Sequence, residues 1–122
     1  MQNNIVDILL VEDNPGDVRS VWNMLREKST FDFTLEAVSR LPAAFERLTQ
    51  GGIDAILLDL SLISTLDETN AIESLVAAAP DLPILVLTVL QNEHEGIKAL
   101  DAGAQDYLLK EEMGSRAIVR AT

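Results

Sequence analysis

Short runs of Ile, Leu and Val alternate along this sequence with segments of helical periodicity. Three runs, at residues 5–11, 53–60 and 83–88, are almost continuously apolar. Such runs are typical of strands buried on both faces of a parallel sheet. Residues 31–38 alternate between apolar and polar side chains and predict a less buried strand. Residues 106–109 predict a short fifth strand.

Amphipathic helices are predicted between these strands, because apolar residues recur there at i, i+3, i+4 and i+7. The three stripes are Val18, Val21, Trp22 and Leu25, then Leu41, Ala44, Phe45 and Leu48, then Ile72, Leu75, Val76 and Ala79. A fourth helix is predicted over 93–102, with Ile97 and Leu100 facing inward and Gly103 ending it. A fifth helix begins at residue 115, with Ile118 and Val119 as its core residues.

This order of elements predicts a parallel sheet, because strands joined by helices make right-handed parallel crossovers. We expect an α/β fold, a three-layer (βα)5 flavodoxin-like sandwich with a five-stranded sheet in the order 2-1-3-4-5. The 122 residues suit one domain. The last helix has only about two turns before residue 122. We therefore expect residues 1–122 to be the N-terminal domain of a longer protein, with its fifth helix incomplete.

Composition excludes several classes of function. The chain has 20 Asp and Glu, 9 Lys and Arg and a net charge of −11, which argues against direct binding to nucleic acid or anionic membranes. It has no cysteine and a single histidine, His94, so thiol catalysis and sites built from several cysteines or histidines are excluded. No run approaches the roughly 18 apolar residues of a membrane span, and the polar residues 1–4 do not have the pattern expected of a signal peptide. We expect a cytoplasmic protein.

Polar residues follow four strands that are neighbours in the predicted sheet, at the edge where such folds bind ligands. They are Glu12 and Asp13, Asp59, Thr88 and Lys110. Adjacent strands lie about 4.8 Å apart, so the carboxylates of Asp13 and Asp59 can share one ion. Mg²⁺ prefers such oxygen ligands and relieves the repulsion between the acids. An aspartate held this way can accept a phosphoryl group, with a lysine and a hydroxyl holding its outer oxygens.

Four segments resemble the signatures of the response-regulator receiver domain of two-component signalling, the CheY-like family. They are VEDNPGD at 11–17, LLDL at 57–60, LT at 87–88 and GAQDYLLK at 103–110. Each motif is weak alone, but the four occur in the right order and spacing. The resemblance runs from about residue 5 to the end of the chain.

The resemblance implies a phosphorylation site and its metal. Asp59 would be the phosphoacceptor, and Lys110 and Thr88 would contact the phosphoryl group. Mg²⁺ would be held by a set of oxygen atoms from Asp13, Asp59, the backbone carbonyl of Ser61 and, through a water, Glu12.

The resemblance also implies a switch and partners. Thr88 and Tyr107 would be the switch residues, and they would reshape the face formed by the fourth helix, the fifth strand and the fifth helix. A histidine kinase or a histidine phosphotransfer protein would supply the phosphoryl group. The receiver would assist this transfer and the later hydrolysis, yet act as a signalling module rather than an enzyme. A C-terminal effector domain outside this chain and a homodimer through the same face would be further partners.

Two other functions stay open. A degenerate receiver would act as an interaction module without phosphorylation, because Val89 and Leu90 can crowd the phosphoryl pocket and the loop after Asp59 lacks Pro and Gly. A flavodoxin-like electron carrier would bind FMN on the same fold. The segment that would form its phosphate loop, residues 12–17, is acidic and would repel a phosphate group, so this alternative is less favoured.

Overall fold

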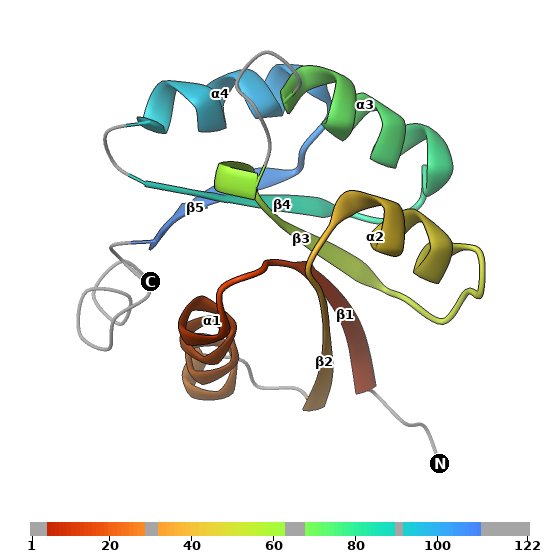
Figure 1. Cartoon of the computed structure of the whole chain (residues 1–122), viewed down its shortest axis with the longest axis vertical. Helices are drawn as coiled ribbons and strands as arrows, with labels where there is room; N and C mark the ends of the chain where they lie inside the picture. The colour runs from red at the N-terminus through yellow and green to blue at the C-terminus, as the bar shows by residue number, and fades with distance from the viewer. Residues whose placement is uncertain (1–4, 29–31, 63–67, 90–91, 111–122) are drawn as a thin grey trace.

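Alternating strands and helices make up the computed structural model, which describes residues 5–28, 32–62, 68–89 and 92–110 (Figure 1). In chain order the elements are β1 (Ile5–Val11), α1 (Pro15–Lys28), β2 (Asp32–Val38), α2 (Leu41–Leu48), β3 (Ala55–Asp59), the 3₁₀ helix η1 (Leu60–Leu62), α3 (Glu68–Ala78), β4 (Ile84–Thr88), α4 (Glu93–Ala102) and β5 (Asp106–Leu109). The predicted strands match these bounds to within two residues at either end. The predicted fifth helix lies outside the described residues.

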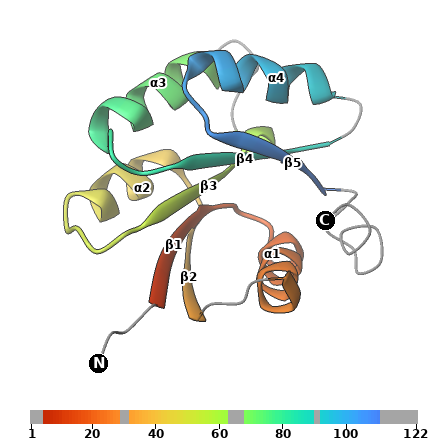
Figure 2. The ribbon, with the colours of Figure 1, turned by 180° about the vertical axis from the view of Figure 1, so that it is seen from behind.

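The five strands form one parallel sheet in the order β2-β1-β3-β4-β5, which confirms the predicted topology. Helix α1 covers one face, while α2, α3 and α4 cover the other, and Figure 2 shows the same arrangement from behind. The molecule therefore has three layers. No helix in the described part of the chain is long and apolar enough to cross a membrane.

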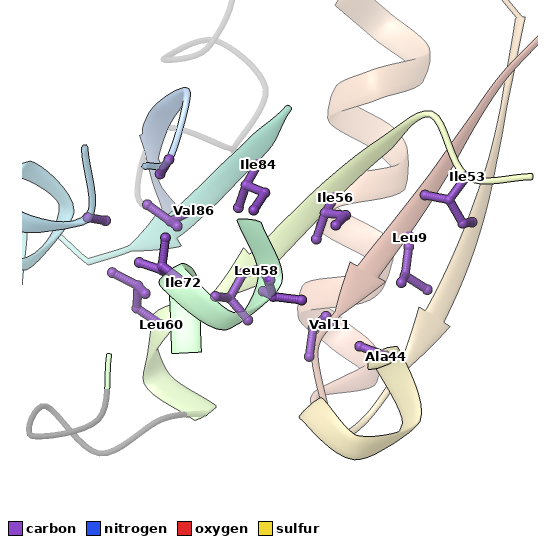
Figure 3. Close-up of a cluster of buried hydrophobic side chains, with 13 residues drawn as sticks. Leu9, Val11, Ala44, Ile53, Ile56, Leu58, Leu60, Ile72, Ile84 and Val86 are labelled. Atoms are coloured by element: carbon purple, nitrogen blue, oxygen red, sulfur yellow. The ribbon is translucent and has the colours of Figure 1, made fainter. Parts of the chain in front are cut away.

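Apolar side chains fill the space on both faces of the central strands. In β1, Leu9 and Val11 join the cluster under α2, α3 and α4, whereas Ile8 and Leu10 join the cluster under α1. Figure 3 shows the first cluster, in which side chains of β1, β3 and β4 meet those of the covering helices. Burial on both faces is what the continuous apolar runs predicted.

The orientation of α1 differs from the prediction at Trp22. The inward face of the helix is made by the buried Val21 and Met24, and the predicted Val18 and Leu25 pack against the same cluster. Trp22 is 40% exposed, so the prediction that it belongs to the inward stripe was wrong. Its ring lies beside that of Phe33 on the edge strand β2, with the two centroids 6.2 Å apart.

Helix α4 is also rotated relative to the prediction. Ile97 is 51% exposed and Leu100 is 36% exposed, so the prediction that both face inward was wrong. The buried positions include Gly96 and Ala99. A Cβ atom at Gly96 would lie 2.9 Å from Cγ of Tyr107, so the ring of this β5 residue needs a helix position without a side chain. The close packing of helix on strand thus turns small residues toward the sheet.

Candidate functional site

Strand register brings the predicted site residues to one rim of the sheet. Val11 lies beside Leu58 in the β1–β3 pair, so Glu12 and Asp59, the next residues along, meet at the carboxyl ends. In the β4–β5 pair, Thr88 lies beside Leu109, and Lys110 follows directly. Asp59 is completely buried and Glu12 is 3% exposed. Two acids are thus held side by side in the interior.

The ammonium group of Lys110 lies among three carboxylates. Its Nζ atom donates to Oδ2 of Asp59 at 2.8 Å and to Oδ2 of Asp17 at 3.0 Å. Oε1 of Glu12 lies 3.7 Å from the same nitrogen. A single positive charge therefore offsets part of the negative charge that the strand ends concentrate here.

Ser61 fixes the orientation of the Asp59 carboxylate. Helix η1 turns the chain just after β3, so that the Ser61 backbone N–H donates to Oδ1 of Asp59 at 3.0 Å. The Ser61 hydroxyl lies 2.9 Å from both Oδ1 and Oδ2. The N–H and the hydroxyl of Ser61 thus both donate to Asp59, and its Oγ atom also accepts from Nζ of Lys110 at 3.5 Å. The metal-binding role of its carbonyl stays a prediction.

The pKa values of the three central groups diverge because of these contacts. Burial acts to raise the pKa of Asp59, but hydrogen bonds from Glu12, Lys110 and Ser61 outweigh it and leave the pKa below its ordinary value. Burial acts to lower the pKa of Lys110, and its hydrogen bonds to Asp59 and Asp17 reverse this and raise the pKa. Burial and the adjoining Asp59 carboxyl group raise the pKa of Glu12 to about 7. Asp59 is therefore the ionised acid of the pair at neutral pH.

Sequence reasoning gave Asp17 no role, although the structure places it in the site. Asn14 accepts hydrogen bonds from the N–H groups of Gly16 at 2.8 Å and Asp17 at 3.1 Å, and so caps the start of α1. The cap sets the first turn of α1 over the rim, where Asp17 reaches Lys110. The sequence did contain a signal for Asp17. It is an acid three residues after Asn14, a cap residue that follows the first strand.

The described residues contain one group of carboxylates close enough to share a metal ion. Ligand atoms of Glu12, Asp17 and Asp59 all lie within 4.8 Å of one another. Oε1 of Glu12 is buried, and no N–H, hydroxyl or ammonium group of the described residues donates a hydrogen bond to it. A buried oxygen of this kind, next to two other carboxylates, matches the hard oxygen ligands that Mg²⁺ and similar ions take. The residues present therefore fit a divalent cation.

Asp13 lies outside that group of carboxylates. It is exposed, directly after the buried Glu12. Its side chain lines a separate cleft of about 350 Å³, whose other lining residues are Ser39, Arg40, Leu41, Pro42 and Leu62. Its role as a direct metal ligand stays a prediction.

The two predicted switch residues both contact the start of α4. The hydroxyl of Thr88, which is buried, donates to the backbone oxygen of Asn92 at 3.3 Å. The hydroxyl of Tyr107 donates at 2.6 Å to Oε2 of Glu93, which directly follows Asn92. The aromatic ring packs against Gly96, one turn further along the helix. Thr88 thus connects the rim to the residue before α4, whereas Tyr107 connects β5 to the first turn of α4.

The sequence profile of the response regulator receiver domain matches residues 8–121. The chain belongs to this family. Among curated proteins it is 37% identical to response regulator MprA of Mycobacterium ulcerans (strain Agy99) over 106 residues, and 36% identical to that of Mycobacterium leprae (strain TN) over 104 residues. These matches cover 86% and 84% of the receiver domain, but 44% and 43% of the two relatives. The domain thus spans less than half the length of these relatives.

Solved structures agree with this assignment. The Mn²⁺-bound form of response regulator Rcp1 is 31% identical to this receiver domain, with a TM-score of 0.67, and the match covers 85% of this chain and 80% of that one. The receiver domain of the TMAO respiratory system regulator TorR has a TM-score of 0.73 over 95% and 92% of the two chains. Its identity is 23%, so that likeness concerns the fold alone.

Proposed function

We propose that this receiver domain accepts a phosphoryl group on Asp59 in a histidine-to-aspartate phosphorelay. One observation carries the proposal. Asp59 is a fully buried carboxylate that stays ionised because Lys110 and Ser61 hydrogen-bond to it. A buried acid with no task would more commonly be neutral or absent, whereas an ionised one beside an ammonium group is poised as a nucleophile.

The chemistry follows from the positions of these groups. An Asp59 carboxylate oxygen would form the new O–P bond while the P–N bond of a phosphohistidine donor breaks, and the donor imidazole would keep the electron pair. Lys110, 2.8 Å from Oδ2 in the unphosphorylated state, would shift toward the phosphoryl oxygens and offset their charge. A histidine kinase or a histidine phosphotransfer protein would supply the donor, since the one histidine of this chain, His94, is 69% exposed on α4 and its described contact is with Glu95.

The acidic residues at the rim support binding of Mg²⁺. Glu12, Asp17 and Asp59 are close enough to hold the ion, and the family resemblance adds Asp13 and the Ser61 carbonyl. When bound, Mg²⁺ supplies positive charge that lets an anionic phosphoryl group approach the acids. The divalent ion in the related Rcp1 structure is consistent with this proposal.

The contacts of Thr88 and Tyr107 support the proposed switch. Thr88 holds the backbone of Asn92 just before α4, and Tyr107 holds Glu93 at its first turn. Movement of the Thr88 hydroxyl toward a phosphoryl group would release the first of these bonds and so alter the face of α4 and β5. This face carries the exposed Ile97, which suits a homodimer or an effector domain. The module would signal from the cytoplasm through this face rather than act as an enzyme.

Phosphorylation in the presence of Mg²⁺ and acetyl phosphate tests the proposal. Intact-mass measurement should show one adduct of about 80 Da, the mass of one phosphoryl group. Asp59→Asn should abolish the adduct, and excess EDTA should prevent it. Asp101→Asn, which neutralises an exposed acid on α4, is the matched control and should be phosphorylated normally. No adduct on the wild type, from acetyl phosphate or a cognate kinase, would favour the degenerate receiver, and a yellow purified protein would favour FMN binding.

A further inference from the structure

A groove of about 520 Å³ lies between α1 and β2, apart from the acidic rim. The residues that line it are Pro15, Val18, Arg19, Trp22, Asn23 and Leu35. None of them contacts Asp59 or Lys110 in the hydrogen bonds and ion pairs described above. The groove therefore needs an explanation of its own.

The floor of the groove is apolar and partly aromatic. Trp22 is 40% exposed, and its ring centroid lies 6.2 Å from that of Phe33 on β2. Val18 and Leu35 continue the apolar surface and are each half-buried. Trp22 is the only tryptophan of the chain, and its exposure leaves a large side chain in contact with solvent. Exposed aromatic side chains of this kind are common at surfaces that bind other molecules.

One side of the groove carries positive charge in an otherwise acidic protein, because Arg19 lines it and Arg26 lies beside the lining residue Trp22. Arg19, Trp22, Asn23 and Arg26 follow one another at i, i+3, i+4 and i+7, and all four are exposed. The Arg26 guanidinium carbon lies 5.2 Å from the Trp22 ring centroid, within the range of a cation–π contact. In the part of the chain that the structure describes, no ion pair joins Arg19 or Arg26 to an acid. Two of the nine basic residues thus stand unneutralised beside an exposed aromatic ring.

The neighbouring strand leaves this surface open. Within the described sheet β2 pairs with β1 alone, so β2 forms the edge. Its Phe33 and Leu35 face the α1 side, where both pack against the cluster beneath this helix. An incoming segment can therefore reach the groove from beyond the edge of the sheet without displacing any described element.

We propose that this groove docks an acidic segment of a partner protein. The segment would insert an apolar side chain between Trp22 and Leu35 and set carboxylates against Arg19 and Arg26. Nucleic acid also pairs with arginine and stacks on tryptophan, but it carries a charge on every phosphate. The net charge of −11 therefore opposes nucleic acid more strongly than a segment with a few carboxylates. A second copy docked groove to groove would place the arginines of both copies in one interface, where the groove lining offers no acid to neutralise them.

Two synthetic peptides test the charge preference. Each would have twelve residues with the same central Leu-Leu-Phe, flanked by Glu and Asp in one peptide and by Lys in the other. Trp22 is the only tryptophan of the chain, so its fluorescence reports binding directly when the peptides contain none. We expect saturable binding of the acidic peptide alone, weakened at least about fivefold by raising the salt from 0.05 to 0.5 M.

Matched charge reversals locate the binding surface. Arg19→Glu should weaken binding of the acidic peptide at least about tenfold, because it turns attraction into repulsion. Lys98→Glu makes the same change in net charge on α4, where the side chain is 62% exposed, and should change affinity less than about twofold. The amide signals of α1 and β2 should shift in a ¹⁵N spectrum of the wild type. Because this spectrum is recorded on the wild type, it locates the binding surface even if a variant folds poorly.

Four results would overturn the proposal. They are equal binding of the two peptides, no binding of the acidic peptide up to about 1 mM, tighter binding of a twelve-nucleotide single strand than of the acidic peptide, and self-association that Arg19→Glu abolishes. The third result would identify nucleic acid as the ligand, and the fourth a second copy of the chain. Phosphorylation of Asp59 is measured separately and does not enter this test.

Discussion

Replacing Glu12 by Gln should remove a pH-dependent loss of stability from the metal-free protein. Burial and the neighbouring Asp59 raise the pKa of Glu12 from 4.5 to about 7. Between these values the folded protein keeps a proton that the unfolded chain has released, so stability falls as the pH rises. A pKa difference of one between the folded and unfolded states is worth about 1.4 kcal/mol, so the rise from 4.5 to about 7 corresponds to about 3 kcal/mol. This loss is absent below pH 4.5 and complete above pH 7.

The other two groups with altered pKa values act outside this window. The lowered pKa of Asp59 affects stability below its ordinary value of 3.8, and the raised pKa of Lys110 affects it above 10.5. Urea unfolding in EDTA, followed by Trp22 fluorescence, would give the free energy of unfolding at pH 5, 6, 7 and 8. The difference between wild type and Glu12→Gln isolates Glu12, because all other titrating groups are shared. Excess Mg²⁺ should reduce this difference, since a cation favours the ionised acid.

The reasoning fails if Glu12→Gln shows the same decline between pH 5 and 8 as the wild type. It fails equally if the wild type gains stability over this range relative to the variant. A smaller decline of the expected sign would mean that water or local rearrangement relieves part of the burial. In that case the carboxyl group would be less confined than the 3% exposure indicates.

Lys110→Met should tighten Mg²⁺ binding at least about tenfold in calorimetry, because the ammonium group competes with the cation for Asp59 at 2.8 Å. It should also slow phosphorylation of Asp59. Gly96→Ala should lower the free energy of unfolding by about 1–3 kcal/mol, since the added Cβ meets the Tyr107 ring at 2.9 Å. This cost should exceed the gain of about 1 kcal/mol that Ala brings to a helix. Tyr107→Phe should lose about 1–2 kcal/mol in urea unfolding because the hydrogen bond to Glu93 is removed.

Different measured outcomes would contradict each of these three predictions. Weaker Mg²⁺ binding by Lys110→Met would mean that the lysine organises the metal ligands rather than competing with the ion. A stabilised Gly96→Ala would mean that the Tyr107 ring moves aside at no cost. Glu93→Gln should cost less than Tyr107→Phe, because the amide oxygen can still accept the phenol hydrogen bond. If it costs as much, the charge of Glu93 matters beyond this bond.

Much of the candidate site could be predicted because local pattern and sheet topology act together. Apolar runs gave the strands, and parallel strands have their carboxyl ends at one edge, so residues far apart in sequence had to meet there. Glu12, Asp59 and Lys110 do meet, with Lys110 bonded to Asp59 across 51 positions. The apolar stripe of α1 indicates which face is buried but not how close its first turn comes to Lys110, and this is why Asp17 was given no role.

The amino-acid sequence by itself determined the alternation of strands and helices, the order of the sheet and three of the residues that meet at its rim, Glu12, Asp59 and Lys110. These depend on periodicity and connection rules, which are local properties of the chain. Only the tertiary structure decided which side chains face which neighbour. It set Asp17 against Lys110 across 93 positions, left Trp22 beside two arginines at the surface, and turned Gly96 rather than Ile97 toward β5. Such choices depend on steric fit between elements, which the spacing of residues along one element does not contain.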